Sequence, residues 1–316
     1  MEYARIEGLK LPVSRLVFGT AFAPMNQGKP ADEILDAVFA AGINTFDTAA
    51  VYGDSEAALG DWIRRRGLEE EVNVLTKGCH PTSWRERVTP YDLMSDLSTS
   101  FAKLGRKRVE LYLLHRDDPT QPVGTIVELL HSLKEQGRIG AYGGSNWTAA
   151  RIREANEYAR EKRLTSFTLS SPQYSLAVTV RDPWGWRCVT LTGEAMAEER
   201  EWYVSTQTPV FAYSSLASGF FSGRFRPDEP EKAREILGPF ASKAFHDPIN
   251  FRRLARAEEL AGNLGMTANQ VALAYTLASP MNVFPIFSTR RREALEENIE
   301  VLERKLTPEQ IAFLEG

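Results

Sequence analysis

The sequence has little cysteine and lacks the marks of several common protein classes. Its 316 residues include two cysteines, Cys79 and Cys188, and neither belongs to a CxxC pair of the kind that forms a structural disulfide or a zinc site. No basic run exceeds three residues and the formal net charge is −4, which argues against a nucleic-acid surface. We therefore expect a reducing compartment, no nucleic-acid partner and no metal.

Long apolar runs are also missing. No stretch approaches the roughly 18 apolar residues of a membrane span, and the N-terminal MEYARIEGLKLP lacks the apolar core of a secretory signal. We expect a cytoplasmic protein without a membrane partner. Since 43% of the residues are hydrophobic and α/β barrels of this length form one domain, we expect a single barrel domain over residues 1–316, as a monomer or a small homo-oligomer.

Short apolar, β-rich runs alternate with longer amphipathic stretches along the chain. Two capping boxes, Thr267–Gln270 and Thr307–Gln310, mark helix starts. Four amphipathic stretches end on a glycine suited to a left-handed helix cap: 31–42, 55–67, 91–105 and 123–137. Eight runs are predicted to be strands: 16–21, 44–49, 72–78, 109–115, 139–146, 167–174, 209–216 and 283–288.

This alternation predicts a parallel sheet, which right-handed crossovers can close or leave open. An open doubly wound sheet normally shows a Gly-rich phosphate turn after an early strand, and the sequence contains no GxGxxG. Eight units in one chain therefore favour an α/β fold of the (β/α)8 TIM barrel type. Two short alternating runs around Gly8-Leu9-Lys10 predict an N-terminal β-hairpin that closes the barrel bottom.

Polar side chains follow three successive predicted strands. They are Asp47 at the end of the second strand, Tyr52 just after it, Lys77 at the end of the third and His115 at the end of the fourth. Taken singly, each has an ordinary explanation: Asp47 can cap a helix, Lys77 can reach out to water, and His115 can be a hydrogen-bonded loop residue. A barrel builds its active site at the C-terminal ends of its strands, so the four together predict one site there.

The residue types suit proton delivery. A tyrosine with a pKa of about 10 is a poor acid at neutral pH unless a cation stabilises its phenolate, and Lys77 is such a cation. An Asp47 carboxylate paired to Lys77 keeps the ammonium charged in a partly dry site. His115 adds a donor that orients a carbonyl oxygen. These four candidate catalytic residues make Tyr52 the general acid or base.

In their order and spacing, these residues resemble the catalytic tetrad of the aldo-keto reductase superfamily, and the resemblance spans almost the whole chain. The stretch FDTAAVYGDSEAALG is similar to that family's signature, with Gly53-Asp54-Ser55-Glu56 in its middle. The resemblance implies an oxidoreductase that interconverts an alcohol and a carbonyl in an aldehyde, ketone or sugar-like compound. It also implies a nicotinamide dinucleotide, NADP(H) before NAD(H), bound without a Rossmann turn.

The same resemblance assigns cofactor-binding residues to the strand ends. The residues that match the carboxamide-binding group are Ser145, Asn146 and Gln173. Tyr213 matches the aromatic ring that stacks on the nicotinamide. The loop expected to follow the pyrophosphate contains Ser214, Leu216, Ser218 and Gly219, which are also ordinary turn formers. The expected set is completed by Gly19, Thr20 and Asp47.

Near the C-terminus, IFSTRRREALEEN resembles the strand-to-helix junction where the family binds the adenosine 2′-phosphate. A helix N-terminus with flanking arginines favours a dianion, because backbone N–H groups add to the side-chain charge. The candidates are Ser288, Thr289, Arg290 and Arg291, with Glu297 and Asn298 facing the adenine. The sequence departs from the family pattern at Phe287-Ser288, where many members have Pro-Gly, and at Ala294, which replaces a frequent basic residue.

Long loops on the catalytic face vary specificity in barrel enzymes. The candidate substrate-binding residues are Trp84, Arg116, Trp147 and Trp184, whereas Trp186 is expected to pack its own loop down. The expected partner is a small-molecule carbonyl or alcohol. The tryptophans favour a polyhydroxylated or sugar-like carbonyl, and the sequence does not decide between it and a hydrophobic aldehyde or ketone.

Two other functions share these features. A redox-sensing, nicotinamide-binding subunit of the potassium-channel β type resembles the same family and can keep the tetrad with little turnover. A Schiff-base aldolase built on Lys77 is disfavoured, because an adjacent aspartate keeps a lysine charged and therefore non-nucleophilic.

Overall fold

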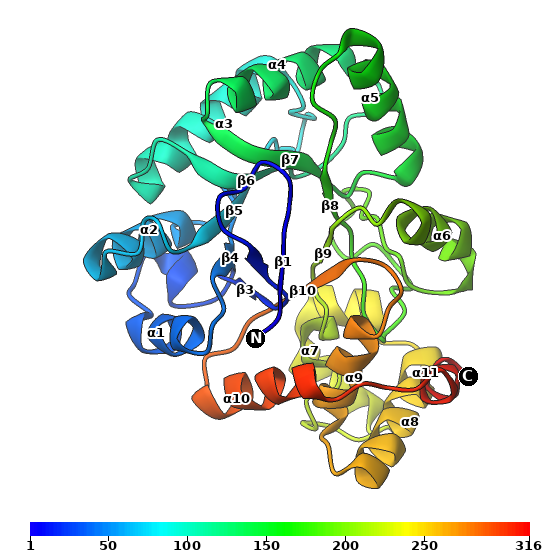
Figure 1. The fold of residues 1–316 in the computed structure, drawn as a ribbon. Coiled ribbons are helices and arrows are strands. Elements are labelled where there is room, and N and C mark those ends of the chain that lie inside the picture. Colours follow the sequence, from blue (N-terminus) through cyan, green and yellow to red (C-terminus); the bar gives the residue numbers. More distant parts are fainter.

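A computed structural model describes residues 1–316, and at its centre eight parallel strands form a closed barrel (Figure 1). The strands are β3 (Val17–Gly19), β4 (Thr45–Asp47), β5 (Asn73–Gly78), β6 (Val109–Leu114), β7 (Ile139–Ser145), β8 (Leu169–Ser171), β9 (Val210–Ala212) and β10 (Val283–Phe287). Each pairs with the next in chain order, and β10 closes the ring against β3. The predicted (β/α)8 TIM barrel is confirmed, with a strand inside every predicted run.

Helices surround the barrel (Figure 1). They are α1 (Asp32–Ala40), α2 (Ser55–Arg66), α3 (Pro90–Leu104), α4 (Gly124–Glu135), α5 (Ala149–Lys162), α6 (Ala197–Thr206), α7 (Pro230–Phe245), α8 (Pro248–Leu264), α9 (Ala268–Leu277), α10 (Arg292–Glu300) and α11 (Pro308–Glu315). Both predicted capping boxes are present, at Thr267 and Thr307. None of the helices combines the length and apolar composition needed to cross a membrane.

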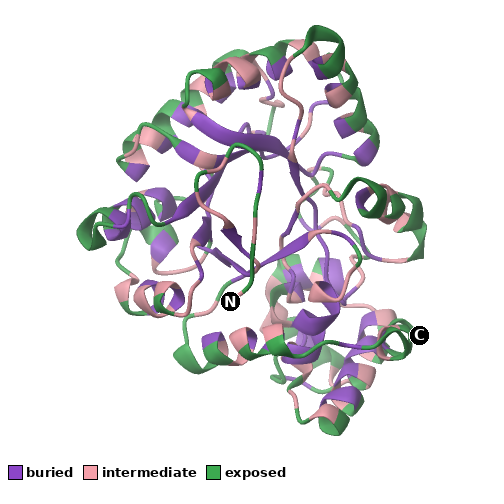
Figure 2. Ribbon diagram, in the orientation of Figure 1, coloured by how far each residue is buried: buried purple, intermediate pink, exposed green.

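Strand side chains separate into two apolar layers, because neighbouring residues of a strand point to opposite faces. On β6, Leu111 and Leu113 belong to an inner cluster that fills the barrel, whereas Tyr112 and Leu114 belong to the larger cluster between strands and helices. Figure 2 shows the barrel strands as buried along their length, with exposed residues on the outer faces of the helices. The barrel interior is therefore a packed core, and a cavity can form only at its ends.

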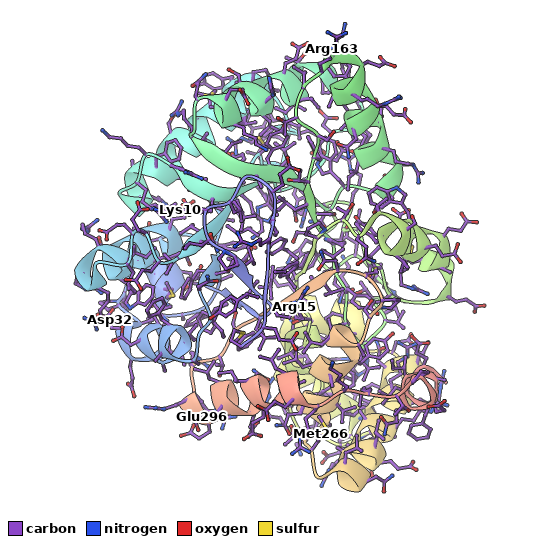
Figure 3. The ribbon with its side chains drawn as sticks, viewed as in Figure 1. Lys10, Arg15, Asp32, Arg163, Met266 and Glu296 are labelled. Atoms are coloured by element: carbon purple, nitrogen blue, oxygen red, sulfur yellow. The ribbon has the colours of Figure 1, made fainter.

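An antiparallel hairpin of β1 (Tyr3–Ala4) and β2 (Val13–Ser14) covers one end of the barrel. Ile6 and Val13 join the inner cluster. The hairpin also binds residues that stand just before the strands: the backbone N–H of Ser14 donates to the Asn44 side chain at 3.0 Å, and Arg15, labelled in Figure 3, donates to the Asn282 side chain at 2.8 Å. The hairpin thus closes the N-terminal end of the barrel, as predicted.

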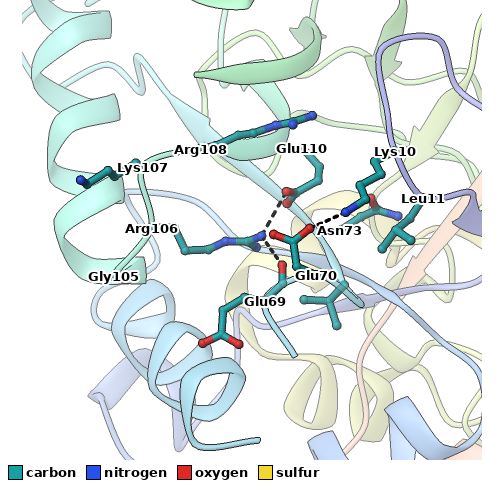
Figure 4. Close-up of a pocket in the computed structure, with 11 residues that line it drawn as sticks. Lys10, Leu11, Glu69, Glu70, Asn73, Gly105, Arg106, Lys107, Arg108 and Glu110 are labelled. Atoms are coloured by element: carbon teal, nitrogen blue, oxygen red, sulfur yellow. Dashed lines mark hydrogen bonds and ion pairs between the residues drawn. The ribbon is translucent and has the colours of Figure 1, made fainter. Parts of the chain in front are cut away.

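A small hollow of about 280 Å³ lies beside this closed end, where β5 and β6 begin (Figure 4). Its charged side chains are largely paired with one another: Lys10 contacts Glu70 at 2.7 Å, and Arg106 contacts Glu110 at 3.1 Å. The first pair ties the hairpin to the segment before β5, and Arg106 ties the start of β6 to the same segment by donating to the carbonyl oxygen of Glu69 at 2.9 Å. These ion pairs therefore stabilise the N-terminal end of the barrel. The active site of a barrel enzyme lies at the opposite end.

Close packing of α2 on α3 depends on Gly60. A Cβ at this position would sit 2.6 Å from the carbonyl carbon of Leu104, so Gly60→Ala must displace one helix. We expect this substitution to lower the free energy of unfolding by about 1–3 kcal/mol, the usual cost of overpacking. The measurement is urea denaturation followed by circular dichroism.

Gly262, in α8, is the matched control. It is exposed, and an added Cβ would meet no atom within 4 Å. Gly262→Ala should raise the free energy of unfolding by about 0.5–1 kcal/mol, because alanine loses less backbone entropy than glycine in a helix. Equal stability of the Gly60→Ala and wild-type proteins would contradict the close approach of the two helices.

Candidate active site

A cavity of about 840 Å³ opens at the C-terminal ends of the barrel strands, at the end away from the hairpin. Its walls come from residues that end or follow each of the eight barrel strands, together with Asn269 of α9. All four residues singled out by their place along the chain line it: Asp47, Tyr52, Lys77 and His115. No group of three or more His, Cys, Asp or Glu side chains in the chain is arranged to hold a metal ion.

Three of these side chains point into the cavity because successive residues of a strand face opposite sides of the sheet. Leu75 and Leu113 face the inner core, so Lys77 and His115, each two residues further on, face the same way above them. On β4, Phe46 packs in the outer layer, and its neighbour Asp47 therefore points inward. Because β4, β5 and β6 are adjacent in the barrel, the three side chains converge.

Lys77 and Asp47 form a buried ion pair at the base of the cavity, with side chains 2% and 6% exposed. The Lys77 ammonium also donates to the carbonyl oxygen of Thr48 at 2.9 Å. Burial opposes the charged form of Lys77, but the Asp47 carboxylate and the Tyr52 oxygen together outweigh it and hold the pKa of Lys77 above its usual value. Lys77 is thus a fixed cation at neutral pH.

Tyr52 stands above this pair, on the turn between β4 and α2. The Lys77 ammonium lies 5.1 Å from the centre of the Tyr52 ring. Burial raises the pKa of the Tyr52 phenol, while the charges of Lys77 and Arg116 act to lower it. The phenol is therefore protonated at rest, and the expected assistance from Lys77 opposes the effect of burial without overcoming it.

Glycine is required next to Tyr52. Gly53 has a φ of 61°, in the left-handed region, and an added Cβ would overlap the carbonyl oxygen of Asn26. The turn that aims Tyr52 into the cavity therefore depends on this glycine.

His115 lies edge-on to Tyr52, with ring centres 5.7 Å apart. Burial lowers the pKa of His115 well below its usual value, and the charges of Lys77 and Arg116 lower it further. The imidazole is therefore neutral at physiological pH. Its Nδ1 is buried without a partner in the protein, and the His80 ring also lies edge-on to His115, with ring centres 4.9 Å apart.

The residues expected to hold the nicotinamide divide into two groups. Ser145, Asn146 and Tyr213 line the cavity, and the Tyr213 hydroxyl donates to Asn146 Oδ1 at 2.8 Å. Gln173 does not line it. Its amide oxygen accepts from Thr179 and Thr190 at 2.8 and 2.7 Å, so this side chain supports the wall behind Tyr213.

The loop after β9 has an unusual backbone. Ser214, Ala217, Ser218 and Gly219 all have positive φ, between 47° and 85°. Such conformations cost free energy in residues other than glycine and cluster at functional sites. Ser214, Leu216, Ser218 and Gly219 line the cavity, as expected for a loop that follows an elongated ligand.

The cavity continues to the junction of β10 and α10. Ser288 donates to the carbonyl oxygen of Gly19 at 2.7 Å. An added Cβ on Gly19 would approach the Ser288 oxygen to 2.9 Å, so position 19 has no room for a side chain. The predicted residues that line this end are Gly19, Ser288, Thr289, Arg291, Glu297 and Asn298. Arg290 and Thr20 lie outside it. Thr20 is buried and donates to the carbonyl oxygen of Asp47 at 3.0 Å.

Of the four predicted substrate-binding residues, two line the cavity and two do not. Arg116 and Trp184 line the cavity. Trp84 is 76% exposed and Trp147 is fully buried, and neither lines it. Trp147 packs over Gly144, which has no Cβ, and its indole N–H donates to the carbonyl oxygen of Arg116 at 3.2 Å. It therefore stabilises the strand end behind the site.

Trp186 lines the cavity rather than packing its own loop down. Further lining residues that the sequence did not single out include Phe22, Val51, Ser215 and Asn269, and His80, from the segment after Lys77, lines the cavity as well. They come from separate loops and one helix, and no local motif marks them.

Known proteins with similar sequences agree with this geometry. The aldo/keto reductase family matches residues 15–316. The aldo-keto reductase str7 of Strobilurus tenacellus is 28% identical over 290 residues, covering 89% of this chain and 78% of the relative. An aryl-alcohol dehydrogenase [NADP(+)] of Phanerodontia chrysosporium is 28% identical over 311 residues, covering 89% of this chain and 74% of the relative.

A putative voltage-gated potassium channel subunit beta of Schizosaccharomyces pombe is 28% identical over 282 residues, covering 85% of this chain and 78% of the relative. The family match covers nearly the whole chain, including every strand of the barrel and every residue of the cavity. The protein therefore belongs to the aldo/keto reductase family, the oxidoreductases of carbonyl and alcohol groups.

Proposed function

We propose that this protein is an NADP(H)-dependent oxidoreductase that interconverts a small-molecule carbonyl compound and an alcohol, with Tyr52 as the general acid or base. The observation that carries the proposal is the buried Lys77–Asp47 pair beneath Tyr52 at the barrel mouth. A fixed cation beside a phenol stabilises the phenolate that forms when the proton leaves. A protein with only a structural use for this pair gains little from burying it.

The cavity suits a nicotinamide dinucleotide. Its lining runs from Asn146 and Tyr213 to Arg291. The closely spaced Gly19 and Ser288 border it, and the loop after β9, whose backbone has positive φ angles, forms part of its wall. Asn146 and Tyr213 would hold the nicotinamide end, and Arg291 with the start of α10 would hold a 2′-phosphate. When bound, the reduced cofactor supplies the hydride for the carbonyl carbon.

The chain's own residues provide the rest of the reaction. Tyr52 donates its phenol proton to the carbonyl oxygen as that oxygen gains negative charge, so hydride and proton together convert the carbonyl to an alcohol. Lys77 stabilises the resulting phenolate, and Asp47 holds Lys77 in place. Neutral His115 donates a hydrogen bond that orients the carbonyl oxygen, and solvent returns the proton to Tyr52.

The substrate end of the cavity favours an aromatic aldehyde or ketone. Phe22, His80, Trp184 and Trp186 present ring faces and edges to the space around Tyr52 and His115. Aromatic side chains bind flat apolar rings through stacked or edge-to-face contacts. The names of several relatives, which describe aryl-alcohol dehydrogenases, are consistent with this proposal.

A nicotinamide-binding channel subunit is the second candidate, because one relative bears that name. The two functions separate in one assay series. Quenching of intrinsic fluorescence by NADPH and by NADH measures binding, and a panel of aldehydes and ketones then measures turnover. Tight NADPH binding with negligible turnover across the panel would favour the subunit. A Schiff-base aldolase is disfavoured, since the raised pKa of Lys77 keeps its amine protonated.

Tyr52→Phe should reduce turnover of a good aldehyde substrate by about 10²- to 10⁴-fold, the usual effect of removing a positioned general acid. NADPH affinity, measured by fluorescence quenching, should stay within a few-fold, because the hydroxyl acts on the substrate. Tyr91→Phe is the matched control, since Tyr91 is 78% exposed and lies outside the cavity. Near-normal turnover by Tyr52→Phe would refute the proposed acid.

Arg291→Ala should weaken NADPH binding by about 10- to 100-fold, which corresponds to losing a charged hydrogen bond, and should spare NADH. Arg292→Ala is the control, because Arg292 is 74% exposed, pairs with Glu296 and does not line the cavity. The measurement is quenching of intrinsic fluorescence by each cofactor. Equal affinities of the unmutated protein for NADPH and NADH would contradict the assignment of a 2′-phosphate site.

A further inference from the structure

Arg116 is a buried cation without a counter-charge. Arg116 follows His115 in the chain, is 5% exposed and lines the cavity. The nearby carboxylates have other partners: Asp47 binds Lys77, and Asp117 binds Arg151 at 3.2 Å. Arg116 itself forms no ion pair with any carboxylate of the chain. Burying an unpaired charge is unfavourable, so a protein that keeps one at a cavity wall has a use for it.

The guanidinium has donors to spare. Nη1 donates to the carbonyl oxygen of His115 at 3.1 Å, and Nη2 donates to the Cys188 sulfur at 3.7 Å, a weak acceptor. Nε is buried and has no partner in the protein. Since a guanidinium carries five N–H donors, most of its hydrogen-bonding capacity is uncommitted.

This cation is separate from the one proposed for the cofactor. Arg116 follows β6, whereas Arg291 follows β10. In the closed barrel, β3, β4 and β5 lie between β6 and β10 on one side, and β7, β8 and β9 lie between them on the other. The two arginines therefore stand on opposite sides of the mouth, with His115 directly before Arg116 in the chain and the Tyr52 ring 5.7 Å from the His115 ring.

We infer that the substrate carries a carboxylate that binds Arg116 while its carbonyl group faces Tyr52 and His115. The inference rests on the proposed function and narrows its substrate class to aromatic oxo acids. A carboxylate matches the planar, two-donor edge of a guanidinium. One uncommitted positive charge balances a single negative charge, which favours a carboxylate over a phosphate dianion.

Trp184 supports the same geometry. Its ring centre lies 5.8 Å from the Arg116 guanidinium carbon, and it lines the cavity together with Trp186. A substrate ring between these aromatic walls would direct a carboxylate toward Arg116. The reduction consumes one hydride and one proton at the carbonyl and leaves the carboxylate unchanged.

The experiment compares 4-formylbenzoate with its methyl ester, which has the same ring and aldehyde but no negative charge. For the wild-type protein with NADPH, kcat/KM should be about 10- to 100-fold higher for the acid, the range expected of a charged hydrogen-bonded contact. Arg116→Met should remove this preference. Arg116→Lys, which keeps the charge in a similar volume, should retain part of it.

Arg187→Met is the matched control, because Arg187 is 54% exposed at its side chain, pairs with Glu86 and does not line the cavity. It should keep the full preference for the acid. A binding readout accompanies the kinetics: 4-carboxybenzyl alcohol should quench tryptophan fluorescence at lower concentration than its methyl ester, and Arg116→Met should remove that difference.

The outcomes separate the two claims. A wild-type protein that reduces both aldehydes with equal kcat/KM, or a preference that survives undiminished in Arg116→Met, overturns the carboxylate site and leaves the reductase function intact. Failure to reduce any aldehyde of the panel, neutral or acidic, overturns the proposed function and this inference with it. The wild-type comparison decides the matter even if Arg116→Met does not fold.

Discussion

The ion pair between Lys77 and Asp47 is the interaction on which the rest of the site depends. Both charges are almost completely removed from water, and each is tolerable only because the other is present. The pair holds a permanent positive charge beneath Tyr52 and beside His115. That one charge acts against the rise in the Tyr52 pKa and adds to the effect of burial that keeps His115 neutral, so it influences the protonation of both neighbours.

The barrel supplies the rigidity that this arrangement needs. Asp47 and Lys77 stand on neighbouring strands whose relative register is fixed by parallel ladder hydrogen bonds and by the packed inner core. A slip of one residue in β5 would turn Lys77 away from the cavity and Thr76 toward it, because side chains alternate between faces. The apolar filling below the site therefore positions the charges above it.

Much of the site was predictable because it follows the strands. Asp47, Lys77 and His115 were placed together from one rule, that parallel strands of a barrel present their C-terminal ends on one side, and the structure brings them together. Loop residues were less predictable. Trp84 and Trp147 were expected at the cavity, yet Trp84 points to solvent and Trp147 is buried behind the strand end. Gln173 shows the same limit, since its hydrogen bonds to Thr179 and Thr190 turn it away from the cavity.

The sequence by itself determined the closed eight-stranded barrel, the hairpin at its base and the order of the charged residues along the strands, because these follow from periodicities of two and of about 3.6 residues within short segments. Only the tertiary structure decided which side chains share the cavity. Phe22, Val51 and Asn269 are distant in sequence, and they line one cavity because separate loops and helices pack around one barrel mouth. Whether a buried charge such as Arg116 finds a partner is likewise decided in three dimensions, since it depends on every element around it and not on its neighbours in the chain.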